Sequence, residues 1–157
     1  MANASVTHST FVIERSYSAP PERVFAAFAD PAAKRRWYGE HQSMSTEEFQ
    51  MDFRVGGNDH VRYRFGSNSP FPGAMLVNHT TYLDIVPEHR IVIAYTMAIN
   101  DKRFSASQAT FEFVRSAGGT DLIFTEQGAY FEGADGPKMR EDGWRKLLDG
   151  LAAWLAS

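Results

Sequence analysis

The C-terminal part of the chain reads GWRKLLDGLAAWL over residues 143–155, and this stretch decides how the rest of the sequence is interpreted. Its large apolar side chains recur at intervals of three and four residues, which is the spacing of one face of an α-helix. The pattern predicts a helix from about Pro137 to Leu155. Its apolar stripe consists of Trp144, Leu147, Leu148, Leu151 and Leu155. Burying these side chains is worth roughly 8–15 kcal/mol before entropy, so the helix must lie against another layer.

The layer that receives this helix is predicted by an alternation of apolar and polar residues through the middle of the chain. The alternating runs are residues 49–55, 61–65, 74–86, 91–97, 105–114 and 122–128. Turn sequences such as Gly56-Gly57-Asn58-Asp59 separate them. Short turns between successive strands imply an antiparallel sheet. Since one face of each strand is apolar, we expect the C-terminal helix to cover that face.

The N-terminal part of the chain predicts one strand and two short helices. Residues 1–9 are small and polar and are expected to be flexible, whereas residues 11–17 alternate as a strand. Pro20-Pro21 opens the first helix, because the first turn of a helix leaves its N–H groups unpaired. The second helix has Asp30 as its N-cap and Gly39 as its C-terminal stop.

Composition excludes several classes of protein. The chain has 157 residues, enough for one domain with a sizeable core, so we expect residues 1–157 to form a single domain. The net charge of −3 and the scattered basic residues do not suggest a nucleic-acid-binding protein. The absence of cysteine excludes disulfides and a cysteine nucleophile. No apolar run or leader sequence predicts membrane insertion or export, so a cytoplasmic protein is expected. The histidines lack metal-ligand spacing, so neither a metal nor a cofactor is predicted.

Several sequence blocks, in this order, resemble the activator of heat-shock-protein-90 ATPase homologue family. They are residues 19–25 with 30–31 and 37–39, residues 52–57, residues 83–91, and Gly143-Trp144 with Leu147, Leu148 and Leu151. Residues 124–128 with Phe131 and Gly133 are similar to a bacterial, single-domain branch of the family. This family belongs to the START-like (SRPBCC) superfamily. The resemblance covers about residues 10–155.

The resemblance implies an α+β fold of the helix-grip type. In this fold a curved antiparallel sheet of about six or seven strands wraps around a long C-terminal helix, two short helices follow the first strand, and a cavity lies between sheet and helix. The superfamily includes lipid binders, hormone receptors, cyclases and co-chaperones. The fold alone therefore does not decide the activity.

Glu126 is an acid in a position where the strand pattern predicts an apolar residue. It shares the inward phase of its strand with Leu122 and Phe124. One interpretation is a general base or polar anchor, whose pKa burial would raise. The other is a buried ion pair with Arg15, which also lies on the apolar phase of its strand, since the helix-grip fold makes the first and last strands neighbours.

Aromatic and apolar residues on the inward faces are the candidate lining of a ligand cavity. Such cavities are mostly apolar with a few placed polar groups, a description that buried tyrosines and Glu126 would fit. The alternative is a plainly packed core. The candidate cavity residues are Trp37, Tyr63, Tyr95, Met97, Phe111, Phe124, Glu126, Trp144 and Leu148.

Three functions remain open at this point, in order of preference. The first is binding of a small apolar or aromatic molecule in the cavity. The second is an enzyme, such as a cyclase or hydrolase, that uses Glu126 with a tyrosine as acid and base. The third is a stress-linked co-chaperone, for which the sequence shows no exposed apolar run. A homodimer through an exposed edge or face of the sheet is a further expectation.

Overall fold

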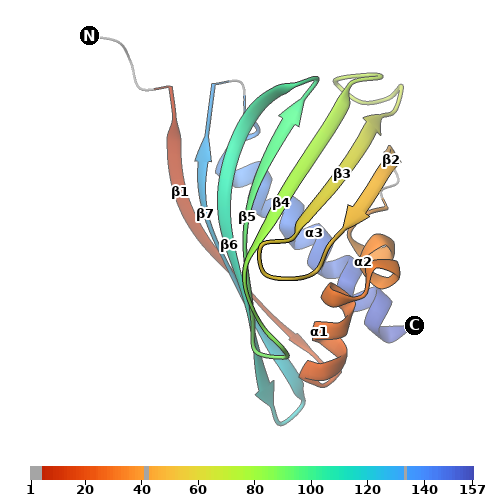
Figure 1. Cartoon of the computed structure of the whole chain (residues 1–157), viewed down its shortest axis with the longest axis vertical. Helices are drawn as coiled ribbons and strands as arrows, with labels where there is room; N and C mark the ends of the chain where they lie inside the picture. The colour runs from red at the N-terminus through yellow and green to blue at the C-terminus, as the bar shows by residue number, and fades with distance from the viewer. Residues whose placement is uncertain (1–4, 41–42, 133) are drawn as a thin grey trace.

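The computed structural model describes residues 5–40, 43–132 and 134–157, and within them it forms one sheet and three helices (Figure 1). The strands are β1 (Thr7–Tyr17), β2 (Met44–Met51), β3 (Asn58–Phe65), β4 (Met75–Val86), β5 (Arg90–Ile99), β6 (Lys102–Ser116) and β7 (Gly119–Tyr130). The helices are α1 (Pro21–Ala29), α2 (Pro31–Trp37) and α3 (Gly136–Ala156).

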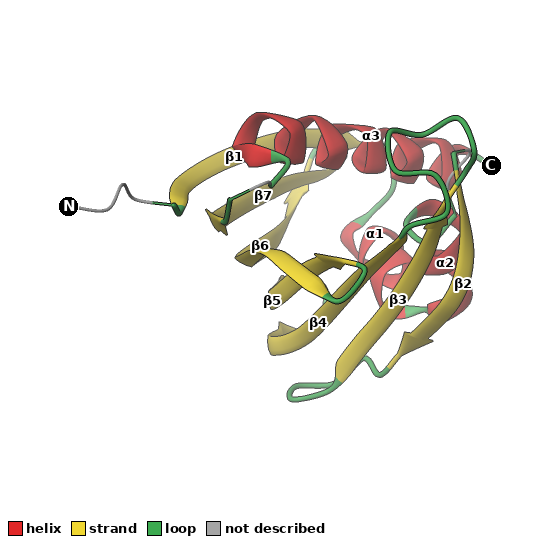
Figure 2. Ribbon diagram, turned by 90° about the horizontal axis from the view of Figure 1, so that it is seen from above, coloured by secondary structure: helices red, strands yellow, loops and turns green. Residues whose placement is uncertain are grey.

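The strands form a single antiparallel sheet in the order β1-β7-β6-β5-β4-β3-β2. Strands β2 to β7 follow one another as a meander, while β1 joins the far edge by pairing with β7. The sheet is curved, and α3 lies across its concave face with α1 and α2 beside it (Figure 2). This arrangement is the predicted helix-grip fold of the α+β class.

The two short helices begin where the sequence predicts. Pro21 is the first residue of α1, and Pro31 is the first residue of α2. The Asp30 side chain accepts a hydrogen bond from the backbone N–H of Ala32 at 3.2 Å, which pairs one of the free N–H groups of the first turn. Helices α1 and α2 thus follow β1 directly and lie at the side of the concave face (Figure 2).

The boundaries of two strands, β1 and β2, differ most from the prediction. Strand β1 begins at Thr7, which pairs with Tyr130, so residues 7–9 lie in the sheet because β7 is long enough to pair with them. Of the rest of the segment predicted to be flexible, residues 5 and 6 are exposed coil, and residues 1–4 lie outside the described residues.

Strand β2 is displaced toward the N-terminus relative to the predicted run of residues 49–55. It covers Met44–Met51, and the chain then turns back on itself. The turn is tight at Gly57, where a Cβ atom would lie 2.2 Å from the Asp52 carbonyl oxygen. The backbone at Gly56 and Gly57 pairs with that of Tyr82 on β4, which ends β2 early.

The main apolar core lies between the concave face of strands β1 and β4 to β7 on one side and helices α1 and α3 on the other. The rings of Phe111 and Phe124 are 4.8 Å apart between centroids, and those of Phe124 and Trp144 are 4.5 Å apart. Leu148 and Leu151 of α3 are fully buried beside them. None of the helices in the described part of the chain is both long and apolar enough to cross a membrane.

Candidate functional site

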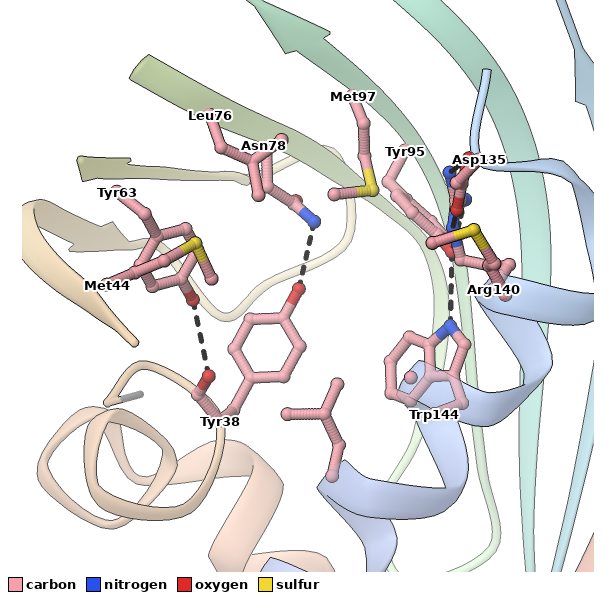
Figure 3. A pocket seen from close by; sticks show the side chains of 13 residues that line it. Tyr38, Met44, Tyr63, Leu76, Asn78, Tyr95, Met97, Asp135, Arg140 and Trp144 are labelled. Carbon is pink, nitrogen blue, oxygen red and sulfur yellow. Dashed lines mark hydrogen bonds and ion pairs between the residues drawn. The ribbon is translucent and has the colours of Figure 1, made fainter. Parts of the chain in front are cut away.

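A cavity of about 200 Å³ lies between the N-terminal half of α3 and strands β2 to β5 (Figure 3). Its apolar lining comes from Met44, Leu76, Met97, Met139 and Leu147, and its aromatic and polar lining comes from Tyr38, Tyr63, Asn78, Tyr95, Asp135, Arg140, Gly143 and Trp144. Met139 is 65% exposed, so the cavity reaches the surface beside the first turns of α3.

The structure places four of the predicted cavity residues on this wall and the other five elsewhere. Tyr63, Tyr95, Met97 and Trp144 line the cavity. Phe111, Phe124 and Leu148 belong to the packed core, and Trp37 donates its indole N–H to the Ala27 carbonyl oxygen within that core. Glu126 lies behind the wall. The inward phase of a strand is shared by cavity and core residues, so alternation alone does not separate them.

Glu126 is the centre of a buried polar cluster under the first turns of α3. The carboxylate is fully buried and accepts a hydrogen bond from Trp144 Nε1 at 3.0 Å. It also accepts hydrogen bonds from the hydroxyl groups of Tyr95 and Tyr130. The cation of the cluster is Arg140, whose Nη1 lies 3.7 Å from Glu126 Oε2. Burial raises the pKa of Glu126, and these donors limit the rise.

The prediction of an ion pair between Arg15 and Glu126 is wrong. Glu126 lies opposite Phe11 on β1, whereas Arg15 lies opposite Leu122. Phe11 and Arg15 are four residues apart along β1, which corresponds to about 13 Å. Arg15 instead pairs with Asp149 of α3 at 3.1 Å. The sequence predicts the face on which each charge lies, but the register along the strands decides which charges meet.

The hydrogen-bonding groups of this cluster are used within the protein. Arg140 donates to Asp135 through Nε at 3.0 Å and through Nη2 at 3.2 Å, and to Ser105 through Nη2 at 2.7 Å. Its Nη1 donates to the Tyr95 hydroxyl at 3.0 Å and to Ser107 at 3.5 Å. Every N–H of the guanidinium therefore has a partner.

Tyr95 lies between Glu126 and the cavity, and all hydrogen-bonding positions of its hydroxyl group are also used. Its hydroxyl hydrogen is donated to Glu126, and its oxygen accepts from Arg140 and from Trp144 Nε1 at 3.1 Å. Burial raises the pKa of Tyr95, so the phenol stays protonated. The Tyr95 hydroxyl therefore has no hydrogen left to donate to a ligand in the cavity.

A second buried polar cluster lies on the other side of Tyr38. Lys34 Nζ donates to Asp59 Oδ2 at 3.0 Å and to the Tyr82 hydroxyl at 3.2 Å. The Tyr82 hydroxyl also donates to Asp59. Asp59 is only 3% exposed, so this contact neutralises a buried charge and fixes α2 on strands β3 and β4.

Between the two clusters, Tyr38 and Asn78 face the cavity. The Asn78 Nδ2 donates to the Tyr38 hydroxyl at 3.0 Å, as Figure 3 shows, and the Asn78 side-chain oxygen accepts from Thr80 at 3.0 Å. The Tyr38 carbonyl oxygen accepts from the Tyr63 hydroxyl at 3.2 Å. Burial raises the pKa of Tyr38 well above its usual range, which keeps its hydroxyl protonated.

Arg140, Tyr38, Asn78 and Met44 were missed by reasoning from the sequence. Arg140 lies four residues before Trp144, so it continues the apolar stripe of α3 and its burial could have been inferred. Tyr38 and Asn78 carry no such signal, because the end of a helix and the register of β4 bring them together. Among the described residues, no group of three or more His, Cys, Asp or Glu side chains is placed to hold a metal ion.

Comparison with known proteins gives a family and several similar structures. A family model described as "Activator of Hsp90 ATPase homolog 1-like protein" matches residues 18–156. The Mll3558 protein from Rhizobium loti is 47% identical, with a TM-score of 0.86 over 96% of this chain and 99% of that one. A putative uncharacterized protein from Rhizobium leguminosarum is 36% identical, with a TM-score of 0.88 over 97% of each chain. Protein CV1439 from Chromobacterium violaceum is 30% identical, with a TM-score of 0.73 over 92% and 95%. No curated protein matches the chain.

Proposed function

Because the chain belongs to the family of activator of Hsp90 ATPase homolog 1-like proteins, we propose that it binds a small apolar or aromatic molecule between the sheet and α3. The observation that carries this proposal is the cavity of about 200 Å³. Its wall combines aromatic rings with three methionines, Met44, Met97 and Met139. Methionine side chains are flexible and polarisable, so they adapt to an apolar ligand.

Catalysis with Glu126 as the base receives less support from this geometry. A general base must reach the proton that it removes, directly or through one water molecule. Glu126 is fully buried behind Tyr95 and Trp144, and its oxygens are engaged by donors from the protein. The polar cluster around Glu126 is better suited to fixing the position of α3 on the sheet.

A co-chaperone role is compatible with the family and requires a docking surface for the chaperone. The exposed large apolar side chains among the described residues are spread over several elements, for example Val12 on β1, Phe71 before β4 and Val114 on β6. We therefore rank this role below ligand binding. Stimulation of the chaperone's ATPase rate by the purified chain would support it and would reverse the order.

Native mass spectrometry of the protein purified from its own host tests the binding proposal. A stoichiometric adduct of a small apolar molecule is the expected result. In a second experiment, a ligand at one hundred times its Kd should add about 2.7 kcal/mol to the free energy of unfolding. For a domain of this size that raises Tm by roughly 5–10 °C.

Gly143 offers a way to block the cavity with little change to the fold. It lines the cavity, and a Cβ atom at this position would meet nothing within 4 Å. Gly143→Leu should therefore fold normally and weaken ligand binding at least tenfold. Ala152→Leu makes a comparable addition at an exposed position of α3 and should leave binding unchanged. Equal binding by both variants would place the ligand outside this cavity and sink the proposal.

A cytoplasmic location is part of the same proposal. It is supported by the cysteine-free sequence, since disulfides form mainly in proteins of oxidising compartments outside the cytoplasm. Fractionation of cells that express the tagged chain would check this location. Recovery of the tag in the membrane or export fraction would contradict it.

A further inference from the structure

The cavity has polar groups on two sides, and they differ in what they can still bind. On the α3 side, Arg140 and Tyr95 have no hydrogen left to donate to a ligand, as described above. On the opposite side, the Tyr38 hydroxyl accepts a hydrogen bond from Asn78. No described residue accepts the hydrogen of that hydroxyl. The Asn78 amide likewise has a second N–H without an acceptor among the described residues.

The charges around the cavity do not favour an anion. Arg140 is the buried cation on this wall, and its neighbours Glu126 and Asp135 are both acids. Ionised, these three side chains sum to a net negative charge, and protonation of Glu126 leaves them neutral. An organic carboxylate or phosphate would lose its hydration shell without gaining a cation in return.

The volume limits the size of the ligand. A cavity of about 150 Å³ with apolar walls is large enough to hold benzene. The cavity of about 200 Å³ found here therefore has room for one ring with a small substituent. The remainder of a larger molecule would lie outside the cavity, beside Met139, where the cavity reaches the surface.

From these three observations we infer that the ligand is an uncharged single-ring molecule whose oxygen accepts a hydrogen bond from the Tyr38 hydroxyl, which Asn78 orients by donating to it. The inference rests on the proposed function and specifies the chemistry of the same site. The oxygen lies at the Tyr38–Asn78 side, and the ring lies among Met44, Met97 and Trp144. Tyr38 and Asn78 are thus the residues that set specificity, and Arg140 does not contact the ligand's polar group.

Three molecules of nearly equal shape test the inference: ethylbenzene, acetophenone and benzoate. Binding is measured at pH 7 by quenching of tryptophan fluorescence and by amide NMR. Acetophenone should bind roughly fivefold more tightly than ethylbenzene, which is the effect of one net hydrogen bond. It should also shift the side-chain amide signals of Asn78. Benzoate should bind at least tenfold more weakly than acetophenone.

Tyr38→Phe removes the hydroxyl and keeps the ring. In this variant acetophenone should lose its advantage over ethylbenzene, while ethylbenzene binds as before. Tyr17→Phe is the matched control, because the Tyr17 hydroxyl is also buried and donates to the Leu148 carbonyl oxygen, outside the cavity lining. It should preserve the fivefold ratio.

The outcomes separate this inference from the proposed function. Equal affinities for acetophenone and ethylbenzene, or tight binding of benzoate, would overturn the inference while ligand binding in the cavity stands. Loss of the ratio in both tyrosine variants would also overturn it. Failure of all three molecules to bind would overturn the proposed function together with the inference. If Tyr38→Phe does not fold, the Asn78 signals of the unmodified protein decide: an unchanged amide signal with acetophenone bound would overturn the inference.

Discussion

Arg140 connects α3 to three strands through Tyr95 on β5, Ser105 on β6 and Glu126 on β7. Replacing it with methionine would leave the Glu126 carboxylate buried without its cation. We expect Arg140→Met to lower the free energy of unfolding by about 3–5 kcal/mol, measured by urea denaturation. The double variant Arg140→Met/Glu126→Gln should recover part of this loss, because the charge that needed a partner is gone.

Arg15 forms an ion pair that is more exposed than that of Arg140. Its side chain is 29% exposed and that of its partner Asp149 is 69% exposed, so water screens their interaction. Arg15→Met should therefore cost below about 1 kcal/mol in the same denaturation experiment. A larger loss than that of Arg140→Met would reverse the roles that the structure assigns to the two arginines.

Glu126 predicts the direction of a pH dependence. Burial raises its pKa above the ordinary value of 4.5 in the folded protein. Between that value and the raised pKa, the folded state holds a proton that the unfolded chain has lost. The contribution of Glu126 to stability is therefore complete below about pH 4.5 and is lost as pH rises through the raised pKa.

Glu126→Gln removes this titration. The difference in the free energy of unfolding between Glu126→Gln and the unmodified protein should therefore change as pH increases from 4 to 8. Urea denaturation at several pH values measures it. A difference that stays constant over this range would show that Glu126 does not titrate differently in the two states.

At the scale of elements, the α3 helix contains a glycine that packing does not require. A Cβ at Gly143 would meet nothing within 4 Å, so neither a strand nor a neighbouring helix lies close to it. Gly143→Ala should raise the free energy of unfolding by about 1 kcal/mol, because alanine loses less backbone entropy in a helix. Thermal denaturation measures the gain, and a decrease would show that the position has a steric requirement.

The elements themselves could be predicted from the sequence, because their signals are local. Asp30 and Pro31 mark the start of α2, and the stripe from Trp144 to Leu155 marks α3. The site could be predicted only in part. Tyr38 at the end of α2 meets Asn78 on β4, 40 residues further along the chain, and the partner of Glu126 depends on how far α3 extends along the sheet. No local pattern encodes these distances.

At the scale of the molecule, a ligand in the cavity would contact β2 to β5 on one side and α3 on the other. Hydrogen exchange should therefore slow on binding in both α3 and these strands, because opening either layer releases the ligand. Protection confined to surface residues would contradict this placement. The predicted homodimer stays a prediction, and sedimentation velocity at several concentrations measures it.

The position of β1 at the edge next to β7 has a consequence for how the protein is made. Strands β2 to β7 are consecutive hairpins, so they can pair as they leave the ribosome. Strand β1 ends at Tyr17 and must wait for β7, which is completed at Tyr130. At about 5–20 residues per second the delay is roughly 6–20 s. The concave apolar face stays uncovered even longer, because α3 follows β7 in the chain. Folding of this domain is therefore completed only after α3 has left the ribosome.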